Sequence, residues 1–136
     1  MVVDGVDIRA VLTGLLLFLF IQLGCVFVDA TFITAVSGSV LGTYAEWVVY
    51  GGTAICGGVT AYISKRGKVY NSFLLGIAIP ISVGFLIFVL PYTGFAVDNV
   101  GAYGAYFMAV VFLPISIFLC TAAGALVTWV RHAALK

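Results

Sequence analysis

Long apolar runs without a single charged residue constrain this chain more than any other feature. The two clearest runs extend from Ala10 to Val28 and from Tyr70 to Leu90. Each is about 20 residues long, and a helix of that length, rising 1.5 Å per residue, crosses the roughly 30 Å hydrocarbon core of a bilayer. Two further apolar stretches have a similar length. The sequence therefore predicts an all-α integral membrane protein, folded as a bundle of four transmembrane helices.

We expect a single membrane domain, residues 1–136, with four helices at about 8–28, 45–64, 70–90 and 104–130. Of the 136 residues, 64% are hydrophobic and 8% are charged, whereas about a quarter of the residues in soluble domains are charged. The polar segments are too short to bury a core of their own. Residues 29–45 fit two structures equally well, an amphipathic helix in the membrane interface or an extension of the first helix followed by a glycine-rich turn.

Charges predict the orientation of the bundle. The connection between the second and third helices reads KRGK, and the C-terminus adds Arg131 and Lys136, whereas the two other connections contain no Lys or Arg. By the positive-inside rule, both termini face the cytoplasm. The segments GGVTAYISKRGK and AAGALVTWVRHA also match, which would make the chain two αα-hairpins in parallel repeat. Shared interfacial constraints explain this match as well as duplication does.

Small residues recur at helical spacing in three of the predicted helices. Such stripes let two backbones approach closely, and this contact drives helix association because lipid provides no hydrophobic gradient between helices. The predicted packing residues are Gly51, Ala54, Gly58, Ala61, Ser72, Gly76, Gly84, Cys120 and Gly124. We expect partners on the faces from Gly51 to Gly58 and from Ser72 to Gly84, in a homo-oligomer or a larger membrane complex.

Two prolines fall inside predicted helices, and each removes one helix hydrogen bond. Pro80 and Pro114 are expected to free the carbonyl groups of Gly76 and Val110. Tolerated bends explain both prolines, although paired kinks also occur in the broken helices of transport sites. Nearby hydroxyl groups are candidates for bonding the freed carbonyls, namely those of Ser82, Ser116 and Thr121.

Groups for catalysis or cofactor binding are scarce. The only histidine, His132, follows the fourth apolar stretch, so neither a Ser-His-Asp set within the membrane nor two-histidine haem ligation is expected. Cys25, Cys56 and Cys120 form no CxxC pair and are interpreted as small packing residues. We therefore expect no enzyme, no cofactor and no metal site. A net charge of +1 also disfavours nucleic-acid binding.

Polar residues suggest two further sites. An oligomeric channel or uniporter would be lined by a polar path, for which the candidates are Gln22, Thr53, Thr60, Glu46 and Asp98. The simpler interpretations are an interhelical hydrogen bond from Gln22 and capping of the second helix by Glu46. In the basic loop, Lys65, Arg66 and Lys68 could attract anionic lipid headgroups, at about 1 kcal/mol each.

The run GGTAICGGVTAYISKRGKVYNSFLLG resembles small four-span membrane proteins of archaea and some bacteria. A double-glycine helix there ends in an aromatic residue, a short basic loop follows, and the next helix opens with Asn or His. The matching residues here are Gly51, Gly52, Gly57, Gly58, Tyr62, Arg66, Gly67, Asn71 and Gly76. Those families have no established activity, so the resemblance implies a four-span fold in a prokaryotic cell membrane. Small multidrug exporters fit less well, because they rely on a carboxylate in the first helix, where this chain has Gln22.

The sequence as a whole predicts a non-enzymatic small membrane protein. Its expected role is that of a structural or accessory subunit, since small-residue stripes are its most prominent sequence feature and groups for catalysis are few. The alternative is the oligomeric channel or uniporter lined by polar, uncharged residues.

Overall fold

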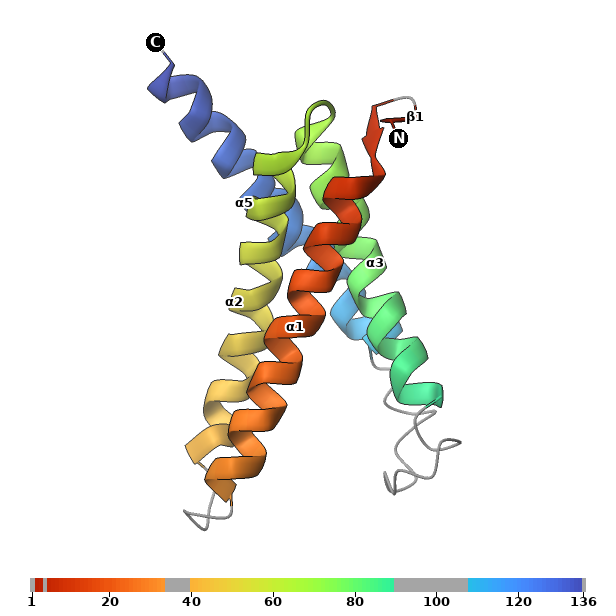
Figure 1. Cartoon of the computed structure of the whole chain (residues 1–136), viewed down its shortest axis with the longest axis vertical. Coiled ribbons are helices and arrows are strands. Elements are labelled where there is room, and N and C mark those ends of the chain that lie inside the picture. Colours follow the sequence, from red (N-terminus) through yellow and green to blue (C-terminus); the bar gives the residue numbers. More distant parts are fainter. Residues whose placement is uncertain (1, 4, 34–39, 90–107, 136) are drawn as a thin grey trace.

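The computed structural model describes residues 2–3, 5–33, 40–89 and 108–135, and it is helical apart from a minimal hairpin (Figure 1). Within these ranges the hairpin pairs β1 (Val2–Val3) with β2 (Val6–Asp7) in antiparallel register. The helical elements are α1 (Ile8–Ile33), α2 (Val40–Ile63), α3 (Lys68–Val89), the π-helix η2 (Met108–Phe112) and α5 (Leu113–Ala134). The predicted helical fold with four main helices is confirmed.

Two of these helices are long and apolar enough to cross a membrane. They comprise Lys68–Leu86 and Val110–Ala134, judged by length and composition. The apolar segments Ile8–Gly24 in α1 and Trp47–Ile63 in α2 are shorter. Two of the four predicted spans therefore meet the test for a membrane-crossing helix within the described residues.

The first helix ends later in the sequence than predicted, and the second helix begins earlier. α1 continues to Ile33 instead of ending near residue 28, because the segment DATFI contains neither Gly nor Pro to stop it. α2 begins at Val40 instead of residue 45. Residues 29–33 thus extend the first helix and 40–45 belong to the second, while 34–39 lie outside the described residues.

The last predicted helix extends further than expected at its C-terminal end. Residues 104–107 lie outside the described part, and α5 ends at Ala134 instead of residue 130. Pro114 is the second residue of α5 and directly follows η2, so it lies where the π-helix passes into the α-helix of one continuous helical segment. Pro80 does lie inside α3, which continues through it.

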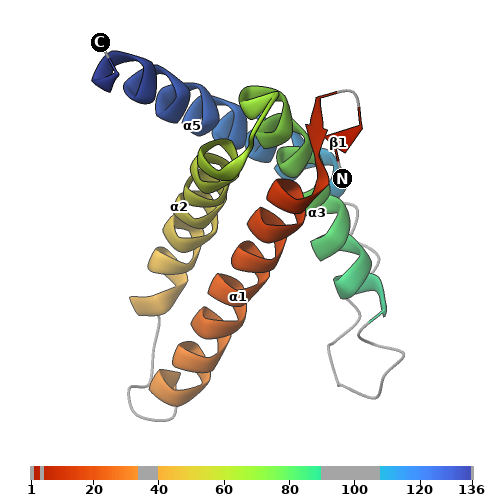
Figure 2. The ribbon, with the colours of Figure 1, turned by 45° about the horizontal axis from the view of Figure 1, so that its top comes forward.

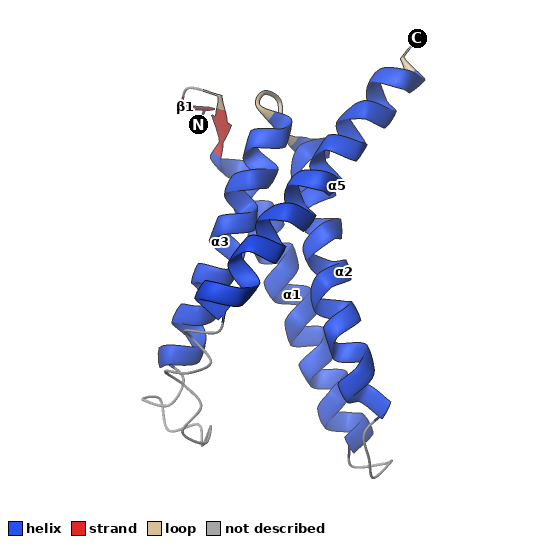
Figure 3. Cartoon of the chain, turned by 180° about the vertical axis from the view of Figure 1, so that it is seen from behind, coloured by secondary structure: helices blue, strands red, loops and turns tan. Residues whose placement is uncertain are grey.

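The helices form a splayed bundle in which α5 crosses α2 and α3. In Figures 1 and 2, α1 and α2 run side by side, while α3 diverges from them toward the lower end of the view. The view from behind shows α5 lying across the other helices (Figure 3). The N-terminal hairpin, the loop after α2 and the end of α5 all lie at one end of the molecule (Figure 1).

The buried core lies where the four helices converge. Its fully or nearly fully buried apolar residues come from every helix and from η2, and are Phe18, Cys56, Leu75, Ile79, Phe112 and Cys120. Aliphatic side chains of α1, α2 and α3 pack around this cluster. The crossing of α5 therefore brings together residues far apart in the sequence.

Candidate functional site

Backbone contact between helices is tightest where α5 crosses its neighbours. A Cβ atom built on Gly76 would lie 2.7 Å from the Cα of Ile117, and one built on Gly57 would lie 2.5 Å from the Cα of Cys120. The obstructing atoms are backbone atoms, which cannot move aside as a flexible side chain can. Glycine therefore permits both crossings, on α3 and on α2, at the middle of the bundle.

A second group of small residues joins α2, α3 and α5 one turn further along. A Cβ atom on Gly124 would overlap the hydroxyl group of Ser72 and lie 3.5 Å from the Cβ of Ala61. The Ser72 hydroxyl donates a hydrogen bond to the Gly57 carbonyl at 2.8 Å. Ser72 and Ala61 are fully buried. These small residues are thus covered within a single chain.

The other predicted packing residues have more varied surroundings. Gly84 is buried, and a Cβ atom on Gly58 would touch Val127 at 3.3 Å. Ala54 is half-buried, whereas Gly51 is exposed and its Cβ would meet no atom within 4 Å. The chain thus covers most of the two faces on which we expected partners, and Gly51 remains open.

Gly57 is a packing residue that the stripe argument missed. The stripe was drawn through Gly51, Ala54, Gly58 and Ala61, although Thr53, Gly57 and Ala61 also recur every four residues. Two small-residue stripes side by side on α2 could not be ranked from spacing alone. The Cys120 thiol of α5 contacts the second stripe by donating to the Thr53 carbonyl at 3.3 Å.

The structure describes the side chains of three of the five residues of the predicted polar path, Gln22, Thr53 and Thr60. The Thr53 hydroxyl donates to the Val49 carbonyl of its own helix at 2.7 Å, and the Thr60 hydroxyl lies 3.4 Å from the Ala10 carbonyl. Gln22 lies beside Gly52, and its side-chain nitrogen is buried without a hydrogen-bond partner among the described residues. The side chains of Glu46 and Asp98 lie outside the described residues.

Two of the three hydroxyl groups that we proposed to bond the carbonyls freed by proline do not do so. Ser116 and Thr121 have buried hydroxyl oxygens without a hydrogen-bond partner in the part of the chain that the structure describes. The prediction for these two residues is wrong.

A network of polar groups, absent from the sequence prediction, ties the start of α1 to the loop after α2. One oxygen of the Asp7 carboxylate accepts from the backbone N–H of Lys65 at 3.2 Å, and the other accepts from that of Ala10 at 3.4 Å. The Asp7 backbone N–H donates to the side-chain oxygen of Asn71 at 3.0 Å. Asp7 thereby caps α1 and anchors the loop at the same time.

Asn71 is the centre of this polar network. Its side-chain nitrogen donates to the Arg66 carbonyl at 2.8 Å and to the Ser64 hydroxyl at 3.1 Å. The Ser64 hydroxyl in turn donates to the Thr60 carbonyl at 2.7 Å. Asn71 and Thr60 are fully buried, and Ser64 is nearly so. The sequence signal was an aspartate directly before an apolar helix, which is typical of a helix N-cap.

Gly67 fixes the shape of the loop. Its φ is +56°, a left-handed conformation that favours glycine, and its carbonyl accepts from the Asn71 backbone N–H at 2.8 Å. A Cβ atom here would overlap the carbonyl oxygen of Gly5 in the N-terminal hairpin. The neighbouring basic side chains of Lys65 and Arg66 are exposed, and Lys68 is half-buried.

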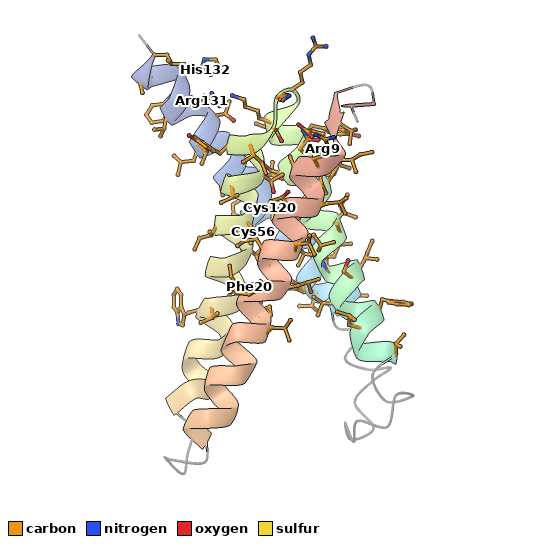
Figure 4. All side chains as sticks on the ribbon, in the orientation of Figure 1. Arg9, Phe20, Cys56, Cys120, Arg131 and His132 are labelled. Carbon is orange, nitrogen blue, oxygen red and sulfur yellow. The ribbon has the colours of Figure 1, made fainter. Side chains whose placement is uncertain are left out.

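Basic residues gather at the end of the molecule that holds this loop. Arg9, Arg131 and His132 all lie there (Figure 4), together with the basic residues of the loop. This arrangement is what the predicted topology requires of the termini and the second connection. The described bundle therefore has one positively charged end.

The Asp7 carboxylate is expected to make folding sensitive to acid. Hydrogen bonds from the backbone N–H groups of Lys65 and Ala10 lower the pKa of Asp7 below its usual value, although burial opposes them. Because the pKa is lower in the folded state, the stabilisation is complete above about pH 4, the pKa of an unfolded aspartate, and is lost as the pH falls through the folded pKa. The Asp7→Asn variant should lose less stability than the unchanged protein when the pH is lowered. Thermal unfolding in detergent between pH 7 and pH 3 measures this difference, and identical profiles would contradict it.

No protein-family model, curated protein or solved structure matches this chain. The candidate site is therefore defined by its own geometry, a small-residue crossing closed by α5 and a polar network at the basic end.

Proposed function

We propose that this chain is an integral membrane protein that acts as a structural or accessory subunit through helix contacts. The observation that carries the proposal is the exposure of large apolar side chains along the helices. On α1, Leu12, Leu16, Phe20 and Leu23 form one stripe and are 52–75% exposed. In water such a surface favours association, whereas lipid or a partner helix covers it without cost.

Further apolar side chains support a membrane setting. Phe85 on α3 and Phe118 on α5 are 66% and 71% exposed. The exposed aromatic residues Tyr62, Tyr70 and Trp129 lie near the basic end, where amphipathic rings prefer the membrane interface. Both features fit a bundle inserted with its basic end at one membrane surface.

Cross-linking tests the subunit role. In a variant with Cys25, Cys56 and Cys120 replaced by Ala, Gly51→Cys should give cross-linked species in native membranes, because its side chain would point into open space. Ser72→Cys is the matched control, since this position is fully buried within the chain. The proposal fails if the purified protein stays strictly monomeric, gives no cross-link and retains no other protein.

The positive-inside argument also fixes an expected orientation in a prokaryotic cell membrane, with both termini in the cytoplasm. Ser39→Cys and Asn99→Cys, two positions outside the described residues, should react with an impermeant thiol reagent added outside the cell. Arg66→Cys, in the exposed basic loop, should react only after the membrane is opened. Labelling of the Arg66 position in intact cells would reverse the orientation.

One observation favours the channel or uniporter as a second candidate. The buried side-chain nitrogen of Gln22 lacks a partner among the described residues, and a buried donor of this kind is satisfied when a polar solute or water passes. Liposomes containing the protein should then show solute flux that falls in the Gln22→Leu variant. Equal flux in protein-free liposomes removes this candidate.

A further inference from the structure

An apolar groove runs between α2 and α5 on the outside of the bundle. Its volume is about 490 Å³, and its lining residues are Ala54, Ile55, Gly58, Val59, Tyr62, Ala123, Leu126 and Val127. The groove is open at the side and is lined by aliphatic groups together with one aromatic ring. Its depth comes from small residues, since Ala54, Gly58 and Ala123 leave space that larger side chains would fill.

One end of the groove carries a cation. Ala54, Gly58 and Tyr62 recur every four residues along α2, and Ala123, Val127 and Arg131 do so along α5, so each set shares one helix face. The groove lining therefore extends about 12 Å along α2, from Ala54 to Tyr62, and about 6 Å along α5, from Ala123 to Val127, and Arg131 lies one turn beyond it.

The Arg131 guanidinium is held at that end by Tyr62. Its carbon atom lies 5.6 Å from the centre of the Tyr62 ring, and one of its nitrogens donates to the Tyr62 carbonyl at 3.4 Å. A guanidinium has five N–H donors in a planar fork that matches the oxygens of a phosphate group. Because Arg131 is exposed, the rest of this fork is accessible from outside the bundle.

The surroundings of Arg131 favour an anionic ligand. Arg9 and the loop after α2, which contains Lys65 and Arg66, lie at the same end of the molecule. The acidic side chain described there, Asp7, already accepts two backbone hydrogen bonds. Trp129, one turn from the groove on α5, is 69% exposed, as expected of a residue at the membrane interface. In the proposed membrane setting, the groove thus leads from the level of the lipid headgroups toward the apolar interior of the bilayer.

We propose that this groove binds one acyl chain of an anionic phospholipid, whose phosphate contacts Arg131. The apolar lining fits a hydrocarbon chain, and the cation at its interfacial end fits the headgroup charge. The inference rests on the membrane location proposed above, and it does not depend on the subunit role. Retention of the chain in carbonate-washed membranes tests that location separately. Failure of the membrane location can therefore be distinguished from failure of the lipid site.

Lipid titration of the purified full chain, followed by native mass spectrometry, tests the site with phosphatidylglycerol and phosphatidylcholine as probes. We expect tighter binding of phosphatidylglycerol, and Arg131→Gln should raise its Kd roughly fivefold, the usual effect of one basic residue on an anionic lipid. Arg9→Gln removes the same charge from the same end but away from the groove, and should change the Kd less than about twofold. Equal effects of the two variants, or equal binding of the two lipids, would overturn the proposal.

Filling the groove provides the second arm of the experiment. Ala123→Phe places a ring in the groove and should abolish the tight phosphatidylglycerol adduct, whereas Ala122→Phe, at an adjacent exposed position, should not. Ala54→Phe fills the groove from α2 and replaces Ala123→Phe if that variant fails to fold. Retained lipid in a folded groove-filled variant contradicts the proposal. Conversion of an oligomer to monomers with an unchanged lipid Kd also contradicts it, because the occupant would then be a second copy.

Discussion

Gly76→Leu is expected to destabilise the bundle by at least about 3 kcal/mol, at the upper end of what overpacking costs. The Cβ atom alone would lie 2.7 Å from the Cα of Ile117 and 3.0 Å from the Ser116 carbonyl oxygen. Neither backbone atom can rotate away, so α3 and α5 must separate. That separation also exposes the core where Ile79 packs. Thermal or denaturant unfolding in detergent measures the loss.

Gly51→Leu is the matched control for this prediction. It introduces the same side chain into a helix, but at a position where nothing lies within 4 Å of the new Cβ. Its effect on unfolding should stay within about 0.5 kcal/mol, the range of ordinary surface substitutions. Membrane insertion of both variants should be normal, because insertion depends on hydrophobicity and leucine increases it. Similar unfolding of the two variants would show that α3 and α5 do not cross at Gly76.

Asn71→Leu is expected to destabilise the protein by about 3 kcal/mol, because it removes several buried hydrogen bonds at once. The change deprives the Asp7 backbone N–H of its acceptor and the Arg66 carbonyl of a donor. A polar group left unpaired in a buried network costs more stability than the loss of a single exposed hydrogen bond. The N-terminal hairpin should also detach from the loop, and faster proteolysis near residues 2–7 would report this directly.

Two milder variants define the size of this effect. Ser64→Ala removes one partner of Asn71 and should cost about 1 kcal/mol. Tyr70→Phe removes a hydroxyl group from the neighbouring side chain, which is 51% exposed, and should be nearly neutral. A gradual series, with Asn71→Leu the least stable, is the expected result. An Asn71→Leu variant as stable as Tyr70→Phe would mean that water replaces the network.

The helical fold could be predicted because apolar composition and helix length are local properties. Uncharged runs locate the helices to within a few residues, and the small residues at Ser72, Gly76 and Gly124 indicate that backbones meet. The choice between covering these residues with α5 or with another chain depends on helix crossing geometry. Spacing within one helix carries no information about that geometry, so the internal contact could not be foreseen.

The polar network was missed for a related reason. Asp7 and Asn71 lie 64 residues apart, and each has an ordinary local explanation, as a helix cap and as the opening residue of a helix. Their contact depends on Gly67, whose left-handed backbone brings the loop against Gly5. A single sequence shows the glycine but not the partner that makes it necessary. The groove between α2 and α5 could not be predicted either, because it exists only when these two helices lie side by side.

The position of α5 across α2 and α3 has a consequence for biosynthesis. Because α5 follows α2 and α3 along the chain, it leaves the ribosome after them, and Gly57 and Gly76 stay uncovered until it arrives. In the proposed membrane setting, helices insert first and associate afterwards, so the crossing forms only after α5 has been translated. Chains stalled before α5 would therefore leave the glycine surfaces at Gly57 and Gly76 bare.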